Sequence, residues 1–368
     1  MTARNHHYVP QFYFRNFSPG GPEGGDVRLI NLARRKYIAT TSIKGQCYRV
    51  GFHDYKPGLE SALGKLEALA APAIRGIISS GVPPEPRSQD HQALAAFTAI
   101  QRSRTHTAAV TSDKMADRMF KIAYEDEAKR RGIDVSNYEI KSPFPVALPL
   151  GVAAKCSPLA MRLGVHVFVN ETSEEFITSD NPVVAHNQYC EGINNRGVLG
   201  WYSTGIQIFL PVSPRHVVLL YDTRVYAVGM KKHRRASQIV DVSEVRSFNA
   251  FQIVVASENL YFRDATMGSR LLAQIEQLAS KRRIKRNITV QSEAVAKGDG
   301  TSELIHQYER IIPLKFQARS VRIKRGMRRI SLDERARMPD TPEMPGDSWP
   351  RDETGVPMRY PAKRSFSA

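Results

Sequence analysis

The spacing of apolar and polar positions predicts helices in the first half of the chain. A first long segment repeats at helical spacing, with apolar residues at Leu59, Leu63, Leu66, Ala70, Ile74 and Ile77. Ser88 is a suitable N-cap for a second helix that runs to about Thr105. Two further helices are expected over residues 114–131 and 149–163. Before all of these, residues 27–32 and 36–43 form a predicted hairpin.

The centre of the chain changes to the two-residue period of strands. Residues 165–170 and 175–179 alternate around four polar residues, which predicts a second hairpin. Further strands are expected at 206–211, 217–222, 224–228 and 259–262, and helices at 241–255 and 265–280. Helices followed by antiparallel strands indicate an α+β fold, with a helical N-terminal half packed on a mainly antiparallel central sheet.

Chain length and composition favour one large domain with a tail. The 368 residues are enough for a well-buried core. We expect a single α+β domain over residues 1–318 and a basic, disordered tail over 319–368, because residues beyond Pro339 are rich in Pro, Asp, Arg and Gly.

Positive charge is the strongest compositional signal. The net charge is +17, and residues 281–368 hold 20 Lys and Arg against 11 Asp and Glu. Compact basic clusters lie at 231–235 and 319–329. Such an excess attracts polyanions and speeds their encounter, so nucleic acid is the expected partner.

Other features of composition predict a cytoplasmic protein with no membrane contact. No apolar stretch approaches the roughly 18 residues needed to span a bilayer. The first residues lack the apolar core of a signal peptide. The three cysteines are far apart and odd in number, so neither a disulfide framework nor a zinc knuckle is expected. The oligomeric state stays open.

The N-terminal block from His6 to Phe17 combines two histidines, an arginine and several aromatic rings. Chain ends are normally frayed and polar. A terminus this rich in rings must therefore dock onto the body of the protein, and it carries the two histidines with it.

His6, His7 and Asp180 form the first candidate set of catalytic residues. Imidazoles serve as acid, base or metal ligand near neutral pH, and a carboxylate can orient an imidazole or complete a two-His-one-carboxylate metal site. The sequence around Asp180 is also typical of a tight turn, in which Asp and Asn bond their own backbone. Catalytic, metal-binding and purely structural interpretations all remain open.

Gln101 and Arg104 form the second set, because they lie on the apolar stripe of the predicted helix. Such a pair could grip a phosphate or carboxylate, or could tie the helix to Glu67 or to the Asp180 turn. The remaining candidates for substrate binding are Gln11, Arg15, Asn181 and Asn249. The sequence contains no recognisable phosphate-binding loop and no hydrolase or kinase motif.

Three of these segments carry a resemblance to a known family. The opening HHYVPQFYFRNF, the run from Gln101 to Thr105 and the run from Phe176 to Pro182 resemble the bacterial family catalogued as domain of unknown function 4238. The order matches along about residues 4–280. The family has no established reaction, so the resemblance implies which positions belong together and supplies no catalytic roles.

These observations predict a polyanion or nucleic-acid binding protein, with phosphodiester cleavage by a His/Asp/Arg site, assisted or not by a divalent metal. One alternative is a non-enzymatic binding module whose His, Gln, Arg and Asp motifs form a structural polar core. Another is a pocket for a small anion. The catalytic hypothesis makes a geometric prediction: His6 or His7, Arg104 and Asp180 should converge.

Overall fold

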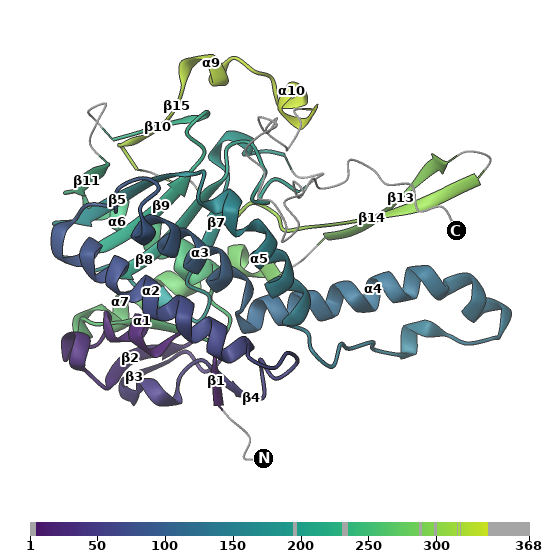
Figure 1. Cartoon of the computed structure of the whole chain (residues 1–368), viewed down its shortest axis with the longest axis horizontal. Coiled ribbons are helices and arrows are strands. Elements are labelled where there is room, and N and C mark those ends of the chain that lie inside the picture. The colour runs from purple at the N-terminus through teal and green to yellow at the C-terminus, as the bar shows by residue number, and fades with distance from the viewer. Residues whose placement is uncertain are drawn as a thin grey trace.

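Two sheets and the helices around them form the body of the protein (Figure 1). The computed structural model describes residues 5–193, 197–229, 235–286, 289–297, 300–314, 316 and 318–337. Within these residues the fold is α+β, as the sequence predicts.

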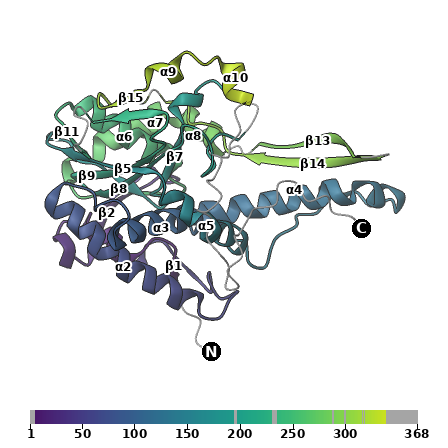
Figure 2. The same ribbon diagram turned by 45° about the horizontal axis from the view of Figure 1, so that its top comes forward.

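The larger sheet has five strands in the order β11-β5-β9-β8-β7. Its strands are β5 (Gly164–Asn170), β7 (Val184–His186), β8 (Gln207–Ser213), β9 (His216–Tyr221) and β11 (Ala236–Ile239). Only β11 runs parallel to its neighbour, and the other pairs are antiparallel. Every residue of β8 is buried, because helices lie on both sides of this sheet, α2 and α3 on one side and α6 on the other (Figure 2).

The smaller sheet joins strands from distant parts of the sequence. Its order is β3-β2-β12-β6, with β2 (Asp26–Asn31), β3 (Lys36–Ser42), β6 (Thr178–Ser179) and β12 (Asn259–Phe262). The predicted hairpin of β2 and β3 is confirmed. The predicted hairpin of residues 165–170 with 175–179 is wrong, because β5 and β6 belong to different sheets.

A local polar turn explains that correction. The side chain of Asn170 donates to the carbonyl of Glu174 and accepts from the backbone of Thr172, so the chain turns tightly after β5. The next residues leave the plane of the first sheet, and β6 pairs with β12 instead. A two-residue period alone does not say which sheet a strand joins.

The helices match the periodic segments closely. They are α1 (Gln11–Arg15), α2 (Leu59–Ser80), α3 (Gln89–Ser103), α4 (His106–Arg130), α5 (Ala147–Ala160), α6 (Val242–Val255), α7 (Gly268–Gln277) and α8 (Ala279–Arg286). Ser88 caps α3 by accepting the backbone N–H of His91, as expected. Thr105 caps α4 in the same way, so this helix starts earlier than the sequence predicts. No helix among the described residues is both long and apolar enough to cross a membrane.

The aromatic N-terminal block docks onto the body. Its first residues form β1 (Asn5–His7), which pairs with β4 (Tyr48–Val50). The side chains of Tyr13, Phe14 and Phe17 are fully buried in the core. The Tyr13 hydroxyl bonds Thr178 of β6, and the Phe14 ring packs on Tyr261 of β12. The sequence prediction of a docked terminus is confirmed.

The C-terminal part of the described chain also packs on the body. Strand β15 (Val321–Ile323) pairs with β10 (Tyr226–Val228), and it is followed by α9 (Arg325–Arg328) and α10 (Leu332–Arg337). The body therefore extends past the boundary at 318 that composition suggested. Residues 338–368, where the disordered tail was expected, lie outside the described residues. Helix α4 and the hairpin of β13 (Thr289–Lys297) and β14 (Gly300–Tyr308) project from the same side (Figures 1 and 2).

Candidate functional site

His6 lies in a cluster with His53 and Glu60. The rings of His6 and His53 stack with centroids 5.4 Å apart and planes 9° from parallel. His6 Nδ1 accepts the backbone N–H of His53 at 3.0 Å, and His53 Nδ1 lies 2.7 Å from Glu60 Oε2. Both histidines are buried, whereas half of the Glu60 side chain is exposed. Strand β1, the turn after β4 and the first turn of α2 therefore meet at one point.

The hydrogen bonds assign the protons in this cluster. Burial acts to raise the pKa of Glu60, but the hydrogen bond from His53 and the charges of His53, His6 and Arg104 outweigh it and lower that pKa. An ionised Glu60 can only accept, so His53 Nδ1 carries the proton. In the neutral ring Nε2 then carries a lone pair, and this atom is buried with no hydrogen-bond partner among the described residues. A carboxylate–histidine pair with a free Nε2 is the arrangement of a general base or of an oriented metal ligand.

The donor set His6, His53 and Glu60 also has the composition of a divalent-metal site. One ligand atom from each of the three lies within 4.8 Å of the others. His6, however, uses Nδ1 as an acceptor, which leaves its proton on Nε2, 3.6 Å from Asp54 Oδ1. Ligation through Nε2 would therefore require His6 to give up its bond to His53. The hydrogen bonds fit the His53–Glu60 pair better than a three-ligand metal centre.

Gln101 and Arg104 form a buried network beside this cluster. Gln101 Nε2 donates to the carbonyl of Tyr8 at 3.0 Å, and its Oε1 accepts from Arg104 Nε at 2.7 Å. Arg104 Nη1 donates to Glu67 Oε1 at 2.8 Å. The Arg104 Nη2 atom is buried without a partner among the described residues. The structural interpretation, in which the pair ties α3 to Glu67, is therefore realised, and one N–H group of Arg104 stays available.

Asp180 lies apart from the histidines. Its carboxylate accepts the backbone N–H groups of Ser257, Glu258 and Asn259 at 2.8, 2.5 and 3.1 Å. Burial raises its pKa to about 6, although these three hydrogen bonds act in the opposite direction. Within the described chain Asp180 makes no ion pair with a histidine or arginine. Its observed contacts hold the turn between α6 and β12.

Tyr8 interacts with the Gln101–Arg104 network through its backbone and with other buried groups through its side chain. Its carbonyl bonds Gln101, and its buried side chain faces Cys47. Burial, Cys47 and the charge of Asp180 all raise the pKa of Tyr8. Gln101 thus joins the N-terminal block to α3, but no described hydrogen bond or ion pair joins Asp180 to His6, His7 or Arg104, so the predicted convergence is not observed.

The other candidate residues occupy separate positions. His7 Nε2 lies 3.1 Å from the carbonyl of Lys44 and 3.4 Å from the side-chain amide of Gln11. Arg15 is exposed on α1. Asn249 is buried and bonds the backbone of Ile177 and Glu175, which ties α6 to the segment before β6. None of these residues contacts His53 or Glu60 among the described interactions.

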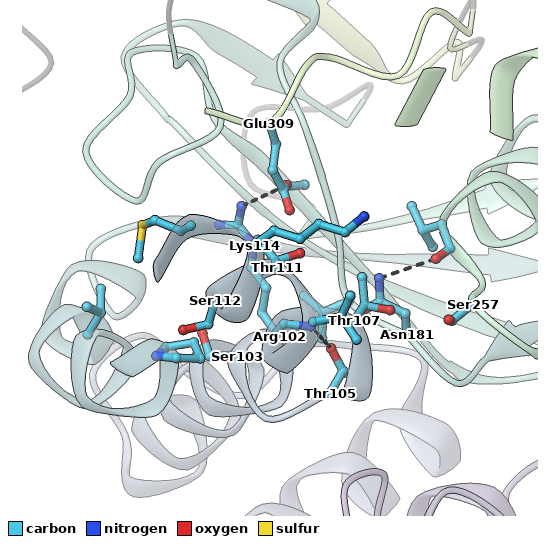
Figure 3. A pocket seen from close by; sticks show the side chains of 18 of the residues that line it. Arg102, Ser103, Thr105, Thr107, Thr111, Ser112, Lys114, Asn181, Ser257 and Glu309 are labelled. Carbon is cyan, nitrogen blue, oxygen red and sulfur yellow. Dashed lines mark hydrogen bonds and ion pairs between the residues drawn. The ribbon is translucent and has the colours of Figure 1, made fainter. Parts of the chain in front are cut away.

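Parts of two motifs line a pocket with a volume of about 730 Å³ (Figure 3). Arg102, Ser103 and Thr105 contribute from the end of α3, and Asn181 contributes from the turn after Asp180. The remaining walls come from α4, α5, the C-terminal end of α6 and the start of β7, with Trp201 and Glu309. The side chain of Lys114 extends along the pocket toward Asn181 (Figure 3).

Sequence reasoning passed over His53 and most of the lining of this pocket, although Asn181 was among its candidates for substrate binding. His53 lies in an irregular turn, and a lone histidine followed seven residues later by Glu60 has no recognisable spacing. Glu60 belongs to the first predicted helix, where most glutamates are part of a solvated edge. Lys114 belongs to a helix rich in alternating charge, where one lysine among many gives no signal.

The fold and these sites define a class of protein: an α+β fold with a docked aromatic N-terminus and a polar network around it. The chain belongs to the family described as Protein of unknown function (DUF4238), whose model matches residues 5–266. No curated protein and no solved structure matches the chain. The match includes the N-terminal block, the α3 network and the Asp180 turn, and it ends before β15 and α9.

Proposed function

We propose that the protein binds nucleic acid or a similar polyanion through its C-terminal basic segment, defined as residues 322–329. The observation that carries this proposal is a group of exposed cations with no carboxylate partner among the described residues: Arg322, Arg325, Arg328 and Arg329, with Lys324 beside them. When such cations contact phosphates, the nucleic acid releases its condensed counterions, and this release favours binding.

The segment is anchored to the body. Strand β15 pairs with β10, and the backbone N–H of Lys324 donates to the carbonyl of Val225. The Lys324 ammonium also donates to the carbonyl of Thr223. Anchored cations lose less conformational freedom on binding than cations on a loose chain, which favours affinity. The second basic cluster, at residues 231–235, lies outside the described residues except for Arg235, which pairs with Glu85.

Fluorescence anisotropy with labelled single- and double-stranded DNA and RNA tests this proposal. The triple variant Arg325→Gln, Arg328→Gln, Arg329→Gln should weaken binding. It should also reduce the slope of log K against log salt by about 2 to 3, because each phosphate contact contributes about 0.7 to 0.9. A matched control, Lys36→Gln, Lys65→Gln, Arg75→Gln, removes the same charge from exposed positions elsewhere. Equal losses in the two variants would show that only net charge matters.

Phosphodiester hydrolysis is the second candidate function, and the His53–Glu60 pair is what favours it. His53 would act as the base that activates water, and the free N–H of Arg104 would stabilise charge on the phosphate. His6, His7 and Asp180 do not occupy those positions, so the proposal now rests on His53, Glu60 and Arg104. The basic segment lies across the body from β1 and β4 (Figures 1 and 2). Binding at the basic segment and cleavage at the His53–Glu60 pair are therefore separate proposals.

Incubation of the wild type with single- and double-stranded RNA and DNA, with and without chelator, tests cleavage. Loss of turnover in both His53→Gln and Glu60→Gln, with the melting temperature within a few degrees of the wild type, would support the base role. Absence of turnover in the wild type, or equal turnover in all three proteins, would leave the non-enzymatic binding module as the function.

We further propose the cytoplasm as the compartment in which the protein acts. Cys47, Cys156 and Cys190 are all free and buried, which suits a reducing environment, and nucleic acid is abundant there. Fractionation of cells that express the tagged protein tests this placement.

A further inference from the structure

We propose that the pocket between α4, α5 and the end of α6 binds a small organic anion with an apolar body. The pocket holds about 730 Å³, within the range of sites for small molecules. It is distinct from the basic segment and from the His53–Glu60 pair, neither of which contributes to its lining. The proposal therefore goes beyond nucleic-acid binding.

One wall of the pocket is a polar stripe on α4. Thr107, Thr111 and Lys114 follow one another at spacings of four and three residues, which places them on one face of the helix. This stripe spans about 10 Å at 1.5 Å per residue. Thr107 Oγ1 is buried and has no hydrogen-bond partner in the described part of the chain. A buried hydroxyl without a partner that lines a pocket is a group that a ligand can satisfy.

The facing wall is apolar. Leu148 and Val152 contribute from α5, and Val183, Val254 and Ala256 contribute from the segments around the Asp180 turn. Leu148 and Val152 are about half exposed, at 52% and 51%, which is unusual for large aliphatic side chains at a pocket. An exposed apolar surface next to convergent polar groups is typical of a ligand site.

The charges in the pocket select an anion. Arg102 is already engaged, because its guanidinium donates to the carbonyl of Leu199, lies 3.8 Å from Glu309 and covers the Trp201 ring. Arg102 and Glu309 therefore largely balance each other. Lys114 is exposed and has no acidic partner among the described residues, so it is the lining cation that can receive a ligand's carboxylate or phosphate.

The buried networks described above give the pocket its shape. Gln101 and Arg104 fix the end of α3, from which Ser103 and Thr105 reach the pocket. Asp180 fixes the turn that carries Ser257, and Asn181 bonds the carbonyl of Val255. The motif residues that make only structural contacts thus position the pocket walls. A ligand site of this kind explains why so many buried polar groups hold together the end of α3, the Asp180 turn and the turn after α6.

Titration with the fluorescent anion 1-anilinonaphthalene-8-sulfonate tests the site, because this probe combines a sulfonate with an apolar ring system. We expect saturable binding at one site. Lys114→Gln should raise the Kd about tenfold, as expected for loss of a hydrogen bond to a charged group. Val152→Glu should weaken binding at least as much, because it places a carboxylate on the apolar wall. Lys65→Gln, an exposed lysine on α2 away from the pocket, is the matched control and should leave the Kd within about twofold.

Two competitors then distinguish the source of the anion. Displacement of the probe by octanoate identifies a carboxylate on an aliphatic chain, and displacement by AMP identifies a phosphate on a ring system. Equal Kd values for Lys114→Gln and Lys65→Gln, or failure of both competitors to displace the probe, would overturn the proposal. Thermal melts of each variant exclude loss of folding. Nucleic-acid binding by the same variants should equal that of the wild type, so failure here is separable from failure of the proposed function.

Discussion

Glu60 orients His53 through a 2.7 Å hydrogen bond, and the opposite nitrogen of the same ring has no partner among the described residues. This relationship predicts one tautomer. In ¹⁵N spectra at pH 8 we expect His53 with a protonated Nδ1 and an unprotonated Nε2. Glu60→Gln should remove this preference, because an amide oxygen is a weaker acceptor than a carboxylate. Glu139→Gln, an exposed control on another segment, should leave the His53 signals unchanged. Unaltered signals in Glu60→Gln would mean that the pair does not form.

Divalent metal should bind this cluster weakly. His6 would have to release the backbone N–H of His53 before its Nε2 could become a ligand. We therefore expect Mg²⁺, Mn²⁺ and Zn²⁺ at 100 μM to leave the melting temperature of the wild type within about 1 °C, since a ligand stabilises only when it exceeds its Kd. A rise in the wild type that is absent in both His6→Asn and Glu60→Gln would show that the three side chains do form a metal centre.

Loss of Gln101 should destabilise the fold. Gln101→Leu leaves the carbonyl of Tyr8 and the Nε of Arg104 without their partners in a buried position. We expect a loss of about 3 kcal/mol in the free energy of unfolding, measured by urea denaturation. Gln92→Leu, on the exposed face of the same helix, should change it by less than about 0.5 kcal/mol. Similar values for the two variants would contradict the structural role of the network.

Asp180 should stabilise the turn that follows α6. Asp180→Asn places an amide NH₂ against backbone N–H donors, so we expect a loss of about 2 kcal/mol and faster hydrogen exchange at Ser257–Asn259. Asp134→Asn, at an exposed cap where Asn serves as well as Asp, should be nearly neutral. Unchanged exchange in Asp180→Asn would contradict this role.

His166 should make the protein acid-sensitive. Burial lowers its pKa to about 4 in the folded state, against about 6.5 when unfolded. The unfolded state therefore binds more protons between these values, so stability is full above pH 6.5 and falls as the pH drops toward 4, by about 3 kcal/mol. In His166→Gln this part of the loss should disappear. Denaturation curves at pH 7 and pH 4.5 that differ equally in both proteins would contradict the assignment.

Sequence periodicity predicted most of the helices and strands but not how the strands assemble into sheets. The stripe of α2, the N-cap of α3 and the hairpin of β2 and β3 depend on local spacing, and all are confirmed. The pairing of β6 with β12 depends on residues about 80 positions apart, and no local pattern encodes it. The end of α3 near Thr105 was predicted, but the start of α4 at His106 was missed, because Thr105 caps a helix whose first turn has no apolar stripe.

For the candidate site, too, the sequence predicted one part of the arrangement and not the other. The proximity of the N-terminal block to the Gln/Arg motif could be inferred from the resemblance of both to one family. The contacts of His6 and Asp180 could not, because their partners are supplied by irregular segments, at His53 and at Ser257–Asn259. Sequence gives no measure of where such backbone N–H groups point.

The contacts of the N-terminal block have a consequence for biosynthesis. Tyr13 and Phe14 are translated well before their partners Thr178 and Tyr261. At about 5 to 20 residues per second, these partners follow roughly 8 to 50 s after the aromatic block. The block therefore docks late in synthesis, and a chaperone that covers residues 5–17 until then should raise the yield of folded protein.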